Sequence, residues 1–474
     1  MMNRSSSGAA ETKSKRIYDL LRERIFQNRY AAGDRLPSTR DLSGELGVSR
    51  STVVEVYEQL IAEGYLESRP GSGTYVANLG KRQRSEAFPH AAKEDGAPAG
   101  LPENPVPFRG IDFRPSFPAL DSVPVRKWKE AALTALDQAS AADFGYAEDP
   151  AGREDLRVIL CRLLLHSKGI RCKPSQVIVT SGATQAIALL CRLLLQPGDV
   201  VATEDPMAPF IRQIFVSTGA ELLPVPVDEH GLRVEELPAT PRPKCVYVTP
   251  SHQFPLGGIL SIGRRFQLLE YARQTGCYVI EDDYDSDFRY EGMPIHALRE
   301  LDEERVVYVG TFSKTLFPAL RIGYMIVPHH LLDPLLRLKR LMDMHGPTLP
   351  QAALARFIAE RHFERHVARM KRVYGKKRSL LIACLRDTFG NGVRISGDAA
   401  GLHLIAEWPD CRFDSRTVAL LERQQIRIYP AERYAIVRGK HENRLVMGFG
   451  NLAESQVEEG VRAIAEIGPG IIRR

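Results

Sequence analysis

Hydrophobic residues near the start of this 474-residue chain recur every three or four positions, as on the buried face of a helix. The spacing predicts a helix over residues 13–31, with Ile17, Leu21 and Ile25 on one face. Two capped helices follow, one from Ser38 to Leu46 and one from Ser49 to Gly64, separated by a Gly-Val turn. Two short alternating segments, 65–68 and 74–76, flank a glycine-rich loop. The pattern predicts a helix-turn-helix with a β-wing.

From Val123 onward, apolar runs of strand length alternate with helical patterns. The strand candidates are residues 177–180, 200–203, 245–249, 278–280 and 306–309. Alternation of this kind predicts a doubly wound α/β fold, in which ligands collect at the carboxyl ends of the strands. The chain is therefore predicted to be a multidomain α/β protein.

The changes of pattern divide the chain into four segments. We predict a DNA-binding winged helix over 10–78 and a flexible linker over 79–121, where prolines are frequent and apolar clusters few. A large α/β domain is expected over 122–345 and a smaller C-terminal α+β domain over 346–474.

Composition narrows the class of protein. A hydrophobic content of 44% and a charged content of 26% are ordinary for a globular protein. No apolar run is long enough to span a membrane, and we expect no signal peptide. The seven cysteines contain no Cys-x-x-Cys pair and are expected to be packed, reduced thiols in a cytoplasmic protein. Two histidines four residues apart, His362 and His366, are interpreted as a solvated helix face, so no metal site is predicted.

The N-terminal segment carries groups suited to double-stranded DNA. The helix opening at Ser49, Arg50, Ser51 and Thr52 would present a guanidinium and three hydroxyls to the major groove. Arg40 lies one helix earlier, and Arg69 and Gly73 belong to the wing. Residues 1–80 hold 11 basic against 10 acidic residues, so any DNA contact must be local. The alternative is a winged helix used only for protein contacts.

Residues 310–324 contain a lysine, Lys314, directly after a strand candidate. Near it are two hydroxyls, Thr311 and Ser313, and a guanidinium, Arg321. Gly182, Ala183 and Thr184 open a helix, whose free N–H groups and dipole can hold a phosphate. Together these groups describe an amine next to an anion site.

A second strand candidate ends in Asp282, Asp283 and Tyr284. In an extended segment Asp282 and Tyr284 face one way and Asp283 the other. An acid for a ring nitrogen, a phenol for a ring oxygen, a lysine and a phosphate site together predict pyridoxal 5'-phosphate (PLP), with Lys314 forming the Schiff base.

Two stretches of the chain resemble known families. Residues 33–76, from Gly-Asp-Arg-Leu-Pro-Ser to Gly-Thr-Tyr-Val, resemble the GntR-type winged helix. The region from about 112 to the end resembles fold-type I aminotransferases, and the phrases at 145–152, 247–253, 281–290 and 310–318 look like MocR-type regulators. The resemblance implies a PLP-bound, domain-swapped homodimer that acts as a transcription factor.

The resemblance also implies roles for further residues. Tyr146 would reach the partner subunit's cofactor phosphate, and His252 or Gln253 would lie near the ring. Ala208 stands where the family commonly has a ring-stacking tyrosine. Arg444 is the first candidate for an effector carboxylate, with Arg433 and Arg427 as rivals.

Three functions fit these features. The first is a transcriptional regulator that senses an amine or amino acid through Lys314. The second is a working aminotransferase with an accessory winged helix, and the third is a regulator that senses PLP itself.

Overall fold

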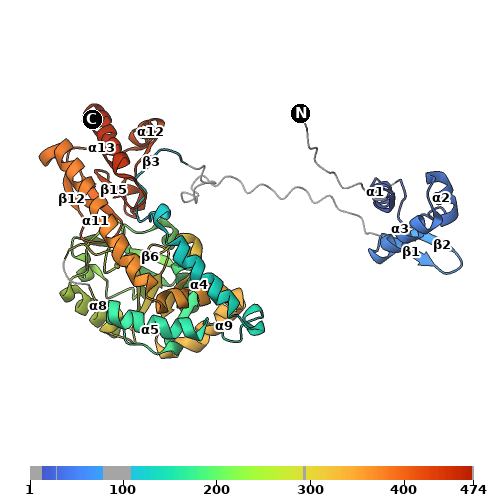
Figure 1. Cartoon of the computed structure of the whole chain (residues 1–474), viewed down its shortest axis with the longest axis horizontal. Coiled ribbons are helices and arrows are strands. Elements are labelled where there is room, and N and C mark those ends of the chain that lie inside the picture. Colours follow the sequence, from blue (N-terminus) through green and yellow to red (C-terminus); the bar gives the residue numbers. More distant parts are fainter. Residues whose placement is uncertain (1–12, 28, 78–107, 292–294, 472–474) are drawn as a thin grey trace. The chain divides into compact units, whose positions relative to one another are not determined.

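The computed structural model describes residues 13–27, 29–77, 108–291 and 295–471. The chain separates into two compact units, Met1–Gly100 and Leu101–Arg474 (Figure 1). Each unit is described by itself.

The smaller unit is a winged helix-turn-helix. Three helices, α1 (Lys13–Phe26), α2 (Thr39–Leu46) and α3 (Arg50–Ala62), precede the antiparallel strands β1 (Leu66–Arg69) and β2 (Gly73–Val76). Ser38 and Ser49 cap α2 and α3, as predicted, by accepting a hydrogen bond from the backbone N–H three residues on. The core contains Leu21, Leu42 and Leu60, each fully buried. The first helix is shorter than predicted and ends at Phe26.

The larger unit is built on an eight-stranded sheet in the order β4-β11-β10-β9-β8-β5-β6-β7. Strands β5, β6, β8, β9 and β10 are parallel, whereas β11 and β7 run antiparallel to their neighbours. The bounds are β4 (Val177–Thr180), β5 (Val200–Asp205), β6 (Glu221–Asp228), β7 (Gly231–Leu232), β8 (Cys245–Val248), β9 (Tyr278–Asp283), β10 (Val306–Thr311) and β11 (Gly323–Ile326).

Helices cover both faces of this sheet, because its strands are apolar on both sides. One face packs against α6 (Ala183–Leu194), α7 (Pro209–Val216) and α9 (Leu332–Asp343). The other packs against α4 (Val125–Asp137), α5 (Glu154–Lys168), α8 (Ile262–Thr275) and α10 (Thr348–Ala359). The predicted doubly wound architecture is confirmed.

A second core lies in the C-terminal part of the larger unit. The antiparallel strands β12 (Arg394–Ser396), β13 (His403–Glu407) and β15 (Arg444–Gly448) pack with α11 (His362–Phe389), α12 (Ser415–Arg423) and α13 (Glu454–Ile471). Figure 1 shows α11 and α13 lying side by side at this end of the unit.

Two predicted boundaries differ from the structure. Residues 108–121, assigned to the linker, belong to the C-terminal core: β3 (Ile111–Asp112) pairs with β14 (Ile426–Arg427), and Phe113 is fully buried. The prolines of this stretch hid the few apolar residues that anchor it. Helix α10, assigned to the smaller domain, packs on the large sheet, and the first turn of α11 does likewise through Phe363. Residues 79–107 of the predicted linker lie outside the described residues.

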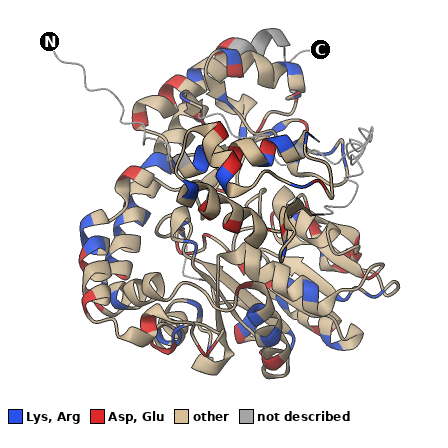
Figure 2. Ribbon diagram, turned by 90° about the vertical axis from the view of Figure 1, so that its right-hand side faces the viewer, with Lys and Arg blue, Asp and Glu red and all other residues tan. Residues whose placement is uncertain are grey.

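Basic and acidic residues are interspersed along the outer helices rather than segregated by sign (Figure 2). None of the helices in the described ranges has the length and hydropathy needed to cross a bilayer.

Phe113→Ala tests the position of the linker boundary. Removing a fully buried phenylalanine leaves a cavity, and we expect the larger unit to lose about 3–5 kcal/mol of unfolding free energy. Denaturant unfolding followed by circular dichroism measures this loss. The control is Arg109→Ala in the same segment, where an exposed side chain changes and stability should hold. Equal stability of both variants would show that residues 108–121 belong to the linker.

Candidate functional site

Polar side chains from four loops meet at the carboxyl ends of the central strands. The loops follow β8, β9 and β10 and join β4 to α6. This is where the crossover connections of a parallel sheet leave a crevice for a ligand. Each residue predicted to touch the cofactor, except Tyr146, lies in one of these loops or in the strand or helix end that adjoins it.

Lys314 follows β10 and is mostly withdrawn from solvent. Burial lowers the pKa of its amine, and the Arg114 guanidinium lowers it further, while Asp285 and Asp282 oppose the shift. A lysine with a lowered pKa is unprotonated more often and is therefore a better nucleophile.

Asp282 lies at the end of β9 with one oxygen satisfied and one free. Its Oδ2 accepts a hydrogen bond from the Tyr247 hydroxyl at 2.7 Å. Its Oδ1 is buried without a hydrogen-bond partner. Burial raises the pKa of this carboxyl to about 6. A buried acceptor without a partner is costly, so Oδ1 suits a donor supplied by a ligand, such as a protonated ring nitrogen.

Asp283 has different partners from its neighbour, as the strand alternation predicts. Its carboxylate forms an ion pair with Lys168 at 3.1 Å and accepts a hydrogen bond from the Tyr308 hydroxyl at 2.7 Å. Although burial opposes ionisation, Lys168 and these hydrogen bonds lower the pKa of Asp283. The carboxylate of Asp283 therefore stabilises the fold, whereas Asp282 keeps one oxygen available to a ligand.

The predicted phosphate site is assembled around Gly182, which has φ 78° and precedes α6 without a side-chain cap. A Cβ at Gly182 would lie 3.0 Å from Arg321 Nη2, and one at Gly323 would lie 2.7 Å from the Gly182 backbone. Arg321 Nη2 donates to the Ser181 carbonyl at 2.6 Å, and no carboxylate within the described ranges pairs with it. This close packing leaves the Arg321 guanidinium beside the uncapped N-terminus of α6, an arrangement that we call the cationic notch.

The hydroxyls of the anion site contact one another. Thr311 Oγ1 donates to Ser313 Oγ at 3.0 Å, and Ser313 N donates to Thr311 Oγ1 at 3.2 Å. Ala183 and Thr184 form the first turn of α6, where backbone N–H groups are free of intrahelical partners. The donor set fits a phosphate.

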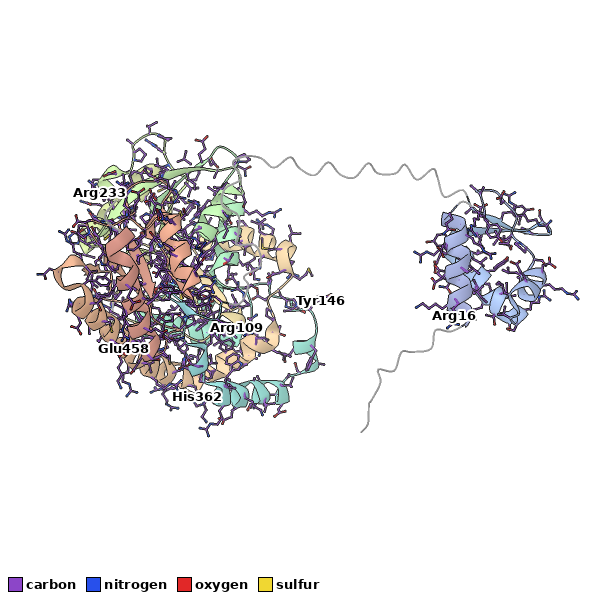
Figure 3. All side chains as sticks on the ribbon, turned by 90° about the horizontal axis from the view of Figure 1, so that it is seen from above. Arg16, Arg109, Tyr146, Arg233, His362 and Glu458 are labelled. Atoms are coloured by element: carbon purple, nitrogen blue, oxygen red, sulfur yellow. The ribbon has the colours of Figure 1, made fainter. Side chains whose placement is uncertain are left out.

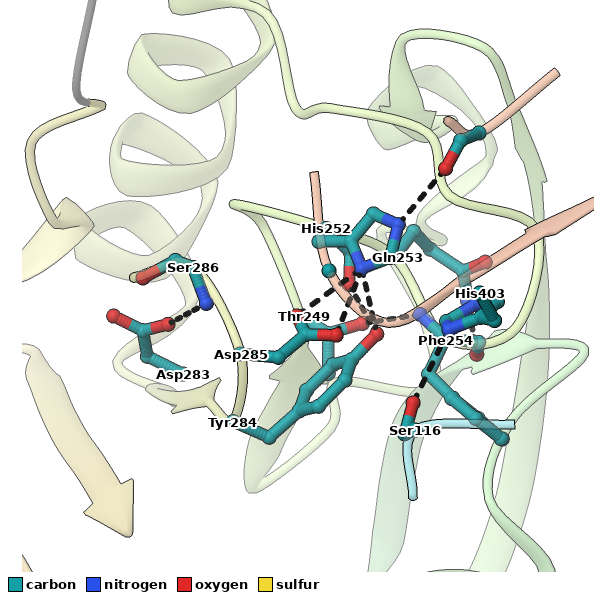
Figure 4. A network of polar contacts seen from close by, with 12 residues as sticks. Ser116, Thr249, His252, Gln253, Phe254, Asp283, Tyr284, Asp285, Ser286 and His403 are labelled. Carbon is teal, nitrogen blue, oxygen red and sulfur yellow. Dashed lines mark hydrogen bonds and ion pairs between the residues drawn. The ribbon is translucent and has the colours of Figure 1, made fainter. Parts of the chain in front are cut away.

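Tyr284 and His252 belong to a buried polar network, drawn in Figure 4. The Tyr284 hydroxyl donates to the His252 carbonyl at 2.9 Å and lies 3.1 Å from His252 Nδ1. His252 Nδ1 is 3.1 Å from Asp285, and Nε2 is 3.1 Å from the Gly397 carbonyl. Gln253, the alternative to His252, instead donates to the carbonyls of Pro206 and Phe254.

The pKa values of the two histidines of this network are shifted in opposite directions. Burial opposes protonation of His252, but the Asp285 carboxylate outweighs it and raises the pKa. Burial and the neighbouring His252 lower the pKa of His403 well below its usual range. His403 Nε2 donates to the Pro255 carbonyl at 2.9 Å, so Nδ1 accepts from Ser116 Oγ at 3.1 Å. Although His252, Asp285 and His403 could together approach a metal ion, both histidines already have hydrogen-bond partners at each ring nitrogen, and we assign none.

Two residues implied by the family resemblance lie away from this crevice. Tyr146 is 83% exposed and contacts only the His345 ring among aromatic groups in the described residues (Figure 3). Arg444 begins β15 and pairs with Glu407 at 3.2 Å. Its strand reaches the crevice at Gly448, which pairs with His403. Four residues of strand span about 13 Å, so the Arg444 backbone is separated from Gly448 by about that distance.

The two alternatives to Arg444 lie in different surroundings. Arg427 donates to Glu422 at 3.0 Å and stacks on Phe108, whereas Arg433 is exposed. The residues that sequence reasoning missed are Tyr247, Asp285, Ser116 and Arg114. Tyr247 and Asp285 lie inside the phrases that carried the family resemblance, but which side chain each would touch depends on the packing of separate strands.

In the smaller unit, the predicted DNA-contacting arginines Arg40, Arg50 and Arg69 are exposed. The Ser49 hydroxyl is occupied in capping α3 and lies 3.0 Å from Ser51 Oγ and 2.6 Å from Thr52 Oγ1. Ser49 therefore fixes the helix end rather than offering a free donor. Arg69 stacks on Tyr75, and Gly73 leaves room for the Arg35 side chain, an exposed cation that the sequence pattern did not single out.

Known families match both units. Residues 13–76 match the bacterial regulatory proteins of the gntR family, and residues 114–464 match aminotransferase class I and II. The chain is a MocR-type transcriptional regulator, a GntR-type winged helix joined to an aminotransferase-like domain.

Individual relatives agree with this assignment. The chain is 34% identical to the uncharacterized HTH-type transcriptional regulator YhdI of Bacillus subtilis, over 94% of each chain. It is 33% identical to the probable rhizopine catabolism regulatory protein MocR of Rhizobium meliloti, over 95% of this chain and 92% of the relative. The larger unit resembles the crystal structure of the multiple substrate aminotransferase of Thermococcus profundus, at 27% identity and a TM-score of 0.70, covering 76% of this chain and 91% of that one.

Asp282→Asn should have opposite effects on the cofactor-free fold and on PLP binding. Folding raises the pKa of Asp282 from 3.8 to about 6, so its ionisation destabilises the folded state as the pH rises through this window. We expect the variant to be more stable than wild type at pH 8, by up to about 3 kcal/mol, and to lose this advantage near pH 4. Its affinity for PLP should fall at least tenfold.

Thermal unfolding without cofactor and a fluorescence titration with PLP measure the two effects. Glu281→Gln is the matched control, because Glu281 is buried on the same strand but accepts the backbone N–H groups of Leu298 and Arg299. It should keep its affinity for PLP. A loss of PLP affinity in Glu281→Gln equal to that in Asp282→Asn would remove Asp282 from the site.

Proposed function

We propose that this regulator binds PLP at Lys314 and binds operator DNA through its winged helix. An amine or amino acid then displaces Lys314 from the cofactor and changes the affinity for DNA. The single observation that carries the proposal is the unpartnered Asp282 Oδ1, buried in the same crevice as a desolvated lysine and a cationic phosphate notch.

The residues of the crevice suit PLP in separate ways. When bound, PLP supplies an aldehyde that condenses with amines and a ring that withdraws electrons. Asp282 would hold the proton on the ring nitrogen. Tyr284 would donate to the ring oxygen once its hydroxyl turns away from the His252 carbonyl. Arg321, Gly182 and the first turn of α6 would hold the phosphate. Burial lowers the pKa of the Lys314 amine, which favours its nucleophilic form, and the amine would be the group that engages the aldehyde and holds a proton.

A homodimer accords with the exposed apolar residues around Tyr146. Phe144, Tyr146, Leu341 and Met344 are all exposed, and Leu341 is 86% exposed. Arg340 donates to the Glu148 carbonyl, and His345 contacts the Tyr146 ring, so the two segments lie together. Apolar side chains gathered in this way mark an interface, and Tyr146 would extend from it toward the partner subunit's phosphate site.

An anionic group of the effector would need a cation that has no carboxylate partner within the protein. Arg444 and Arg427 have carboxylate partners. Arg114 is exposed, and no ion pair involves it within the described ranges. It adds to the lowering of the Lys314 pKa that burial causes, and its guanidinium lies over the Phe117 ring. We assign Arg114 to the effector, in the space that Ala208 leaves beside the cofactor.

The ligand acts on DNA binding only if one arrangement of the protein binds it better than another. A turnover enzyme is the second candidate, since the lowered pKa of Lys314 suits a proton-transferring base as well. Steady release of an oxo acid from a PLP-loaded sample would select the enzyme. A response of DNA affinity to PLP alone would select the PLP sensor.

Lys314→Ala should abolish the ligand response while leaving DNA binding in place. A panel of amines and amino acids is screened for compounds that change the visible absorption of the PLP-loaded wild type. Operator affinity is then measured by gel shift with and without the responding compound. Lys173→Ala, an exposed lysine of the same unit, should respond like wild type. A response retained in Lys314→Ala would refute the covalent mechanism.

Arg50→Ala should weaken specific DNA binding by about 5- to 150-fold, the loss of one base-contacting arginine. Arg162→Ala removes an exposed arginine from the larger unit and keeps the same net charge as Arg50→Ala. Equal operator binding by the two variants in a gel-shift titration would sink the assignment of Arg50.

Arg114→Gln should distinguish an amino acid from the amine that lacks its carboxylate. Losing one charge-assisted hydrogen bond weakens binding of the amino acid about 10-fold or more and leaves the amine unchanged. The measurement is the titration of the visible absorption with each compound of the pair. Arg444→Gln is the control and should retain the preference. A preference lost in Arg444→Gln and kept in Arg114→Gln would restore Arg444 as the anchor.

A further inference from the structure

Two cysteines outside the crevice lie in contact. Cys161 is on α5 and Cys172 follows that helix, and the Cys172 thiol donates a hydrogen bond to Cys161 Sγ across 3.4 Å. Both side chains are partly exposed. Since a disulfide has a sulfur–sulfur length of about 2.05 Å, the two sulfurs need to approach by little more than 1 Å to bond.

Two buried arginines flank this pair. Arg157 lies one helical turn before Cys161, and its Nε is buried without a hydrogen-bond partner. Arg299, on the Cys172 side, is fully buried and donates to the carbonyls of Glu303, Val306 and Val327. Its Nε also has no partner, and no carboxylate within the described residues forms an ion pair with it. Arg157 pairs with Asp149 at 2.5 Å, so Arg299 is the member of this flanking pair that lacks a carboxylate partner. A cation beside a thiol favours the thiolate, but the hydrogen bond to Cys161 and burial outweigh Arg299 and raise the pKa of Cys172.

The pair differs from the protein's other thiols. Hydrogen bonding by Cys172 lowers the pKa of Cys161, and Arg157 adds to the effect. Burial raises the pKa of Cys191, Cys245, Cys277, Cys384 and Cys411. All seven cysteines are in the described ranges, so Cys161 is the one thiol of the chain with a lowered pKa. The asymmetry gives each member a role: Cys161 as the nucleophile and Cys172 as the thiol that resolves it.

We propose that Cys161 and Cys172 form a redox-active dithiol that peroxides oxidise to an intramolecular disulfide. The Cys161 thiolate attacks one peroxide oxygen, which forms a sulfenic acid and releases hydroxide when the oxygen–oxygen bond breaks. The Cys172 sulfur then attacks the Cys161 sulfur, and the hydroxyl leaves as water. In total, two thiols lose two electrons and two protons, and hydrogen peroxide is reduced to two molecules of water.

The disulfide would act on a segment that supports the cofactor crevice. The loop it closes contains Lys168, which is buried and forms the ion pair with Asp283, the neighbour of Asp282. The same loop packs on residues 296–300, where the Ala297 N–H donates to the Lys168 carbonyl at 3.0 Å. Oxidation therefore restrains the chain next to the acid of the site, and this consequence does not depend on which ligand the crevice binds.

The test is oxidation of the reduced full-length protein with hydrogen peroxide, followed by peptide mapping. Trypsin releases Cys161 in residues 158–162 and Cys172 in residues 172–192, because the bond from Lys173 to Pro174 resists cleavage. We expect these two peptides to become linked, at a rate at least tenfold faster than Cys384 is oxidised. Cys384 is the matched control, since it too is partly exposed.

Single substitutions show which two cysteines form the link. The peptide 172–192 also contains Cys191, so the link must vanish in Cys172→Ser and in Cys161→Ser and persist in Cys191→Ser and Cys384→Ser. Circular dichroism of the reduced variants confirms folding, and alanine at the same position replaces any serine variant that fails to fold. A link that survives Cys172→Ser, or oxidation of Cys161 and Cys384 at equal rates without a link, would overturn the proposal.

Discussion

The cofactor crevice depends on a buried carboxylate that the protein only half satisfies. Tyr247 fixes one oxygen of Asp282, and nothing in the described part of the chain reaches the other. The fold tolerates this cost because strands β8, β9 and β10 are parallel and apolar, and they bring Tyr247, Asp282 and Lys314 to one edge. A ligand that supplies a donor to Oδ1 would recover the free energy that burial of Asp282 costs. A protonated ring nitrogen is one group that could supply this donor.

Other charged groups of the larger unit form ion pairs within the protein. Asp283 pairs with Lys168, Asp285 with His252, and Arg444 with Glu407. Compensated groups hold the fold, while Lys314, Arg321 and Arg114 keep their polar atoms available. The contrast between Asp282 and Asp283 is the clearest example, since adjacent residues of one strand serve a ligand and the fold respectively. The role of each aspartate therefore depends on its partner on the neighbouring strand and not on residue type alone.

The sequence was sufficient for the architecture and for the residues whose spacing carries the chemistry. Period-two alternation separated Asp282 from Asp283, and serine caps marked α2 and α3. It failed where few residues carry the signal: Ile111 and Phe113 anchor a proline-rich stretch that looked like linker. Arg444 as the effector's anchor stays a prediction. Its strand does reach the site, but the direction of β15 puts Gly448, and not Arg444, beside His403. Pairs such as Cys161 with Cys172 need three-dimensional packing to be seen.

The central claim is that Lys314 is the residue that PLP engages. Cofactor-free protein is mixed with one equivalent of PLP, reduced with borohydride to trap the bond, and digested for peptide mapping. The account predicts that the pyridoxyl group is found on the peptide containing Lys314, and that labelling is suppressed by inorganic phosphate competing at Arg321. Labelling spread over exposed lysines, with Lys314 unmodified, would contradict it.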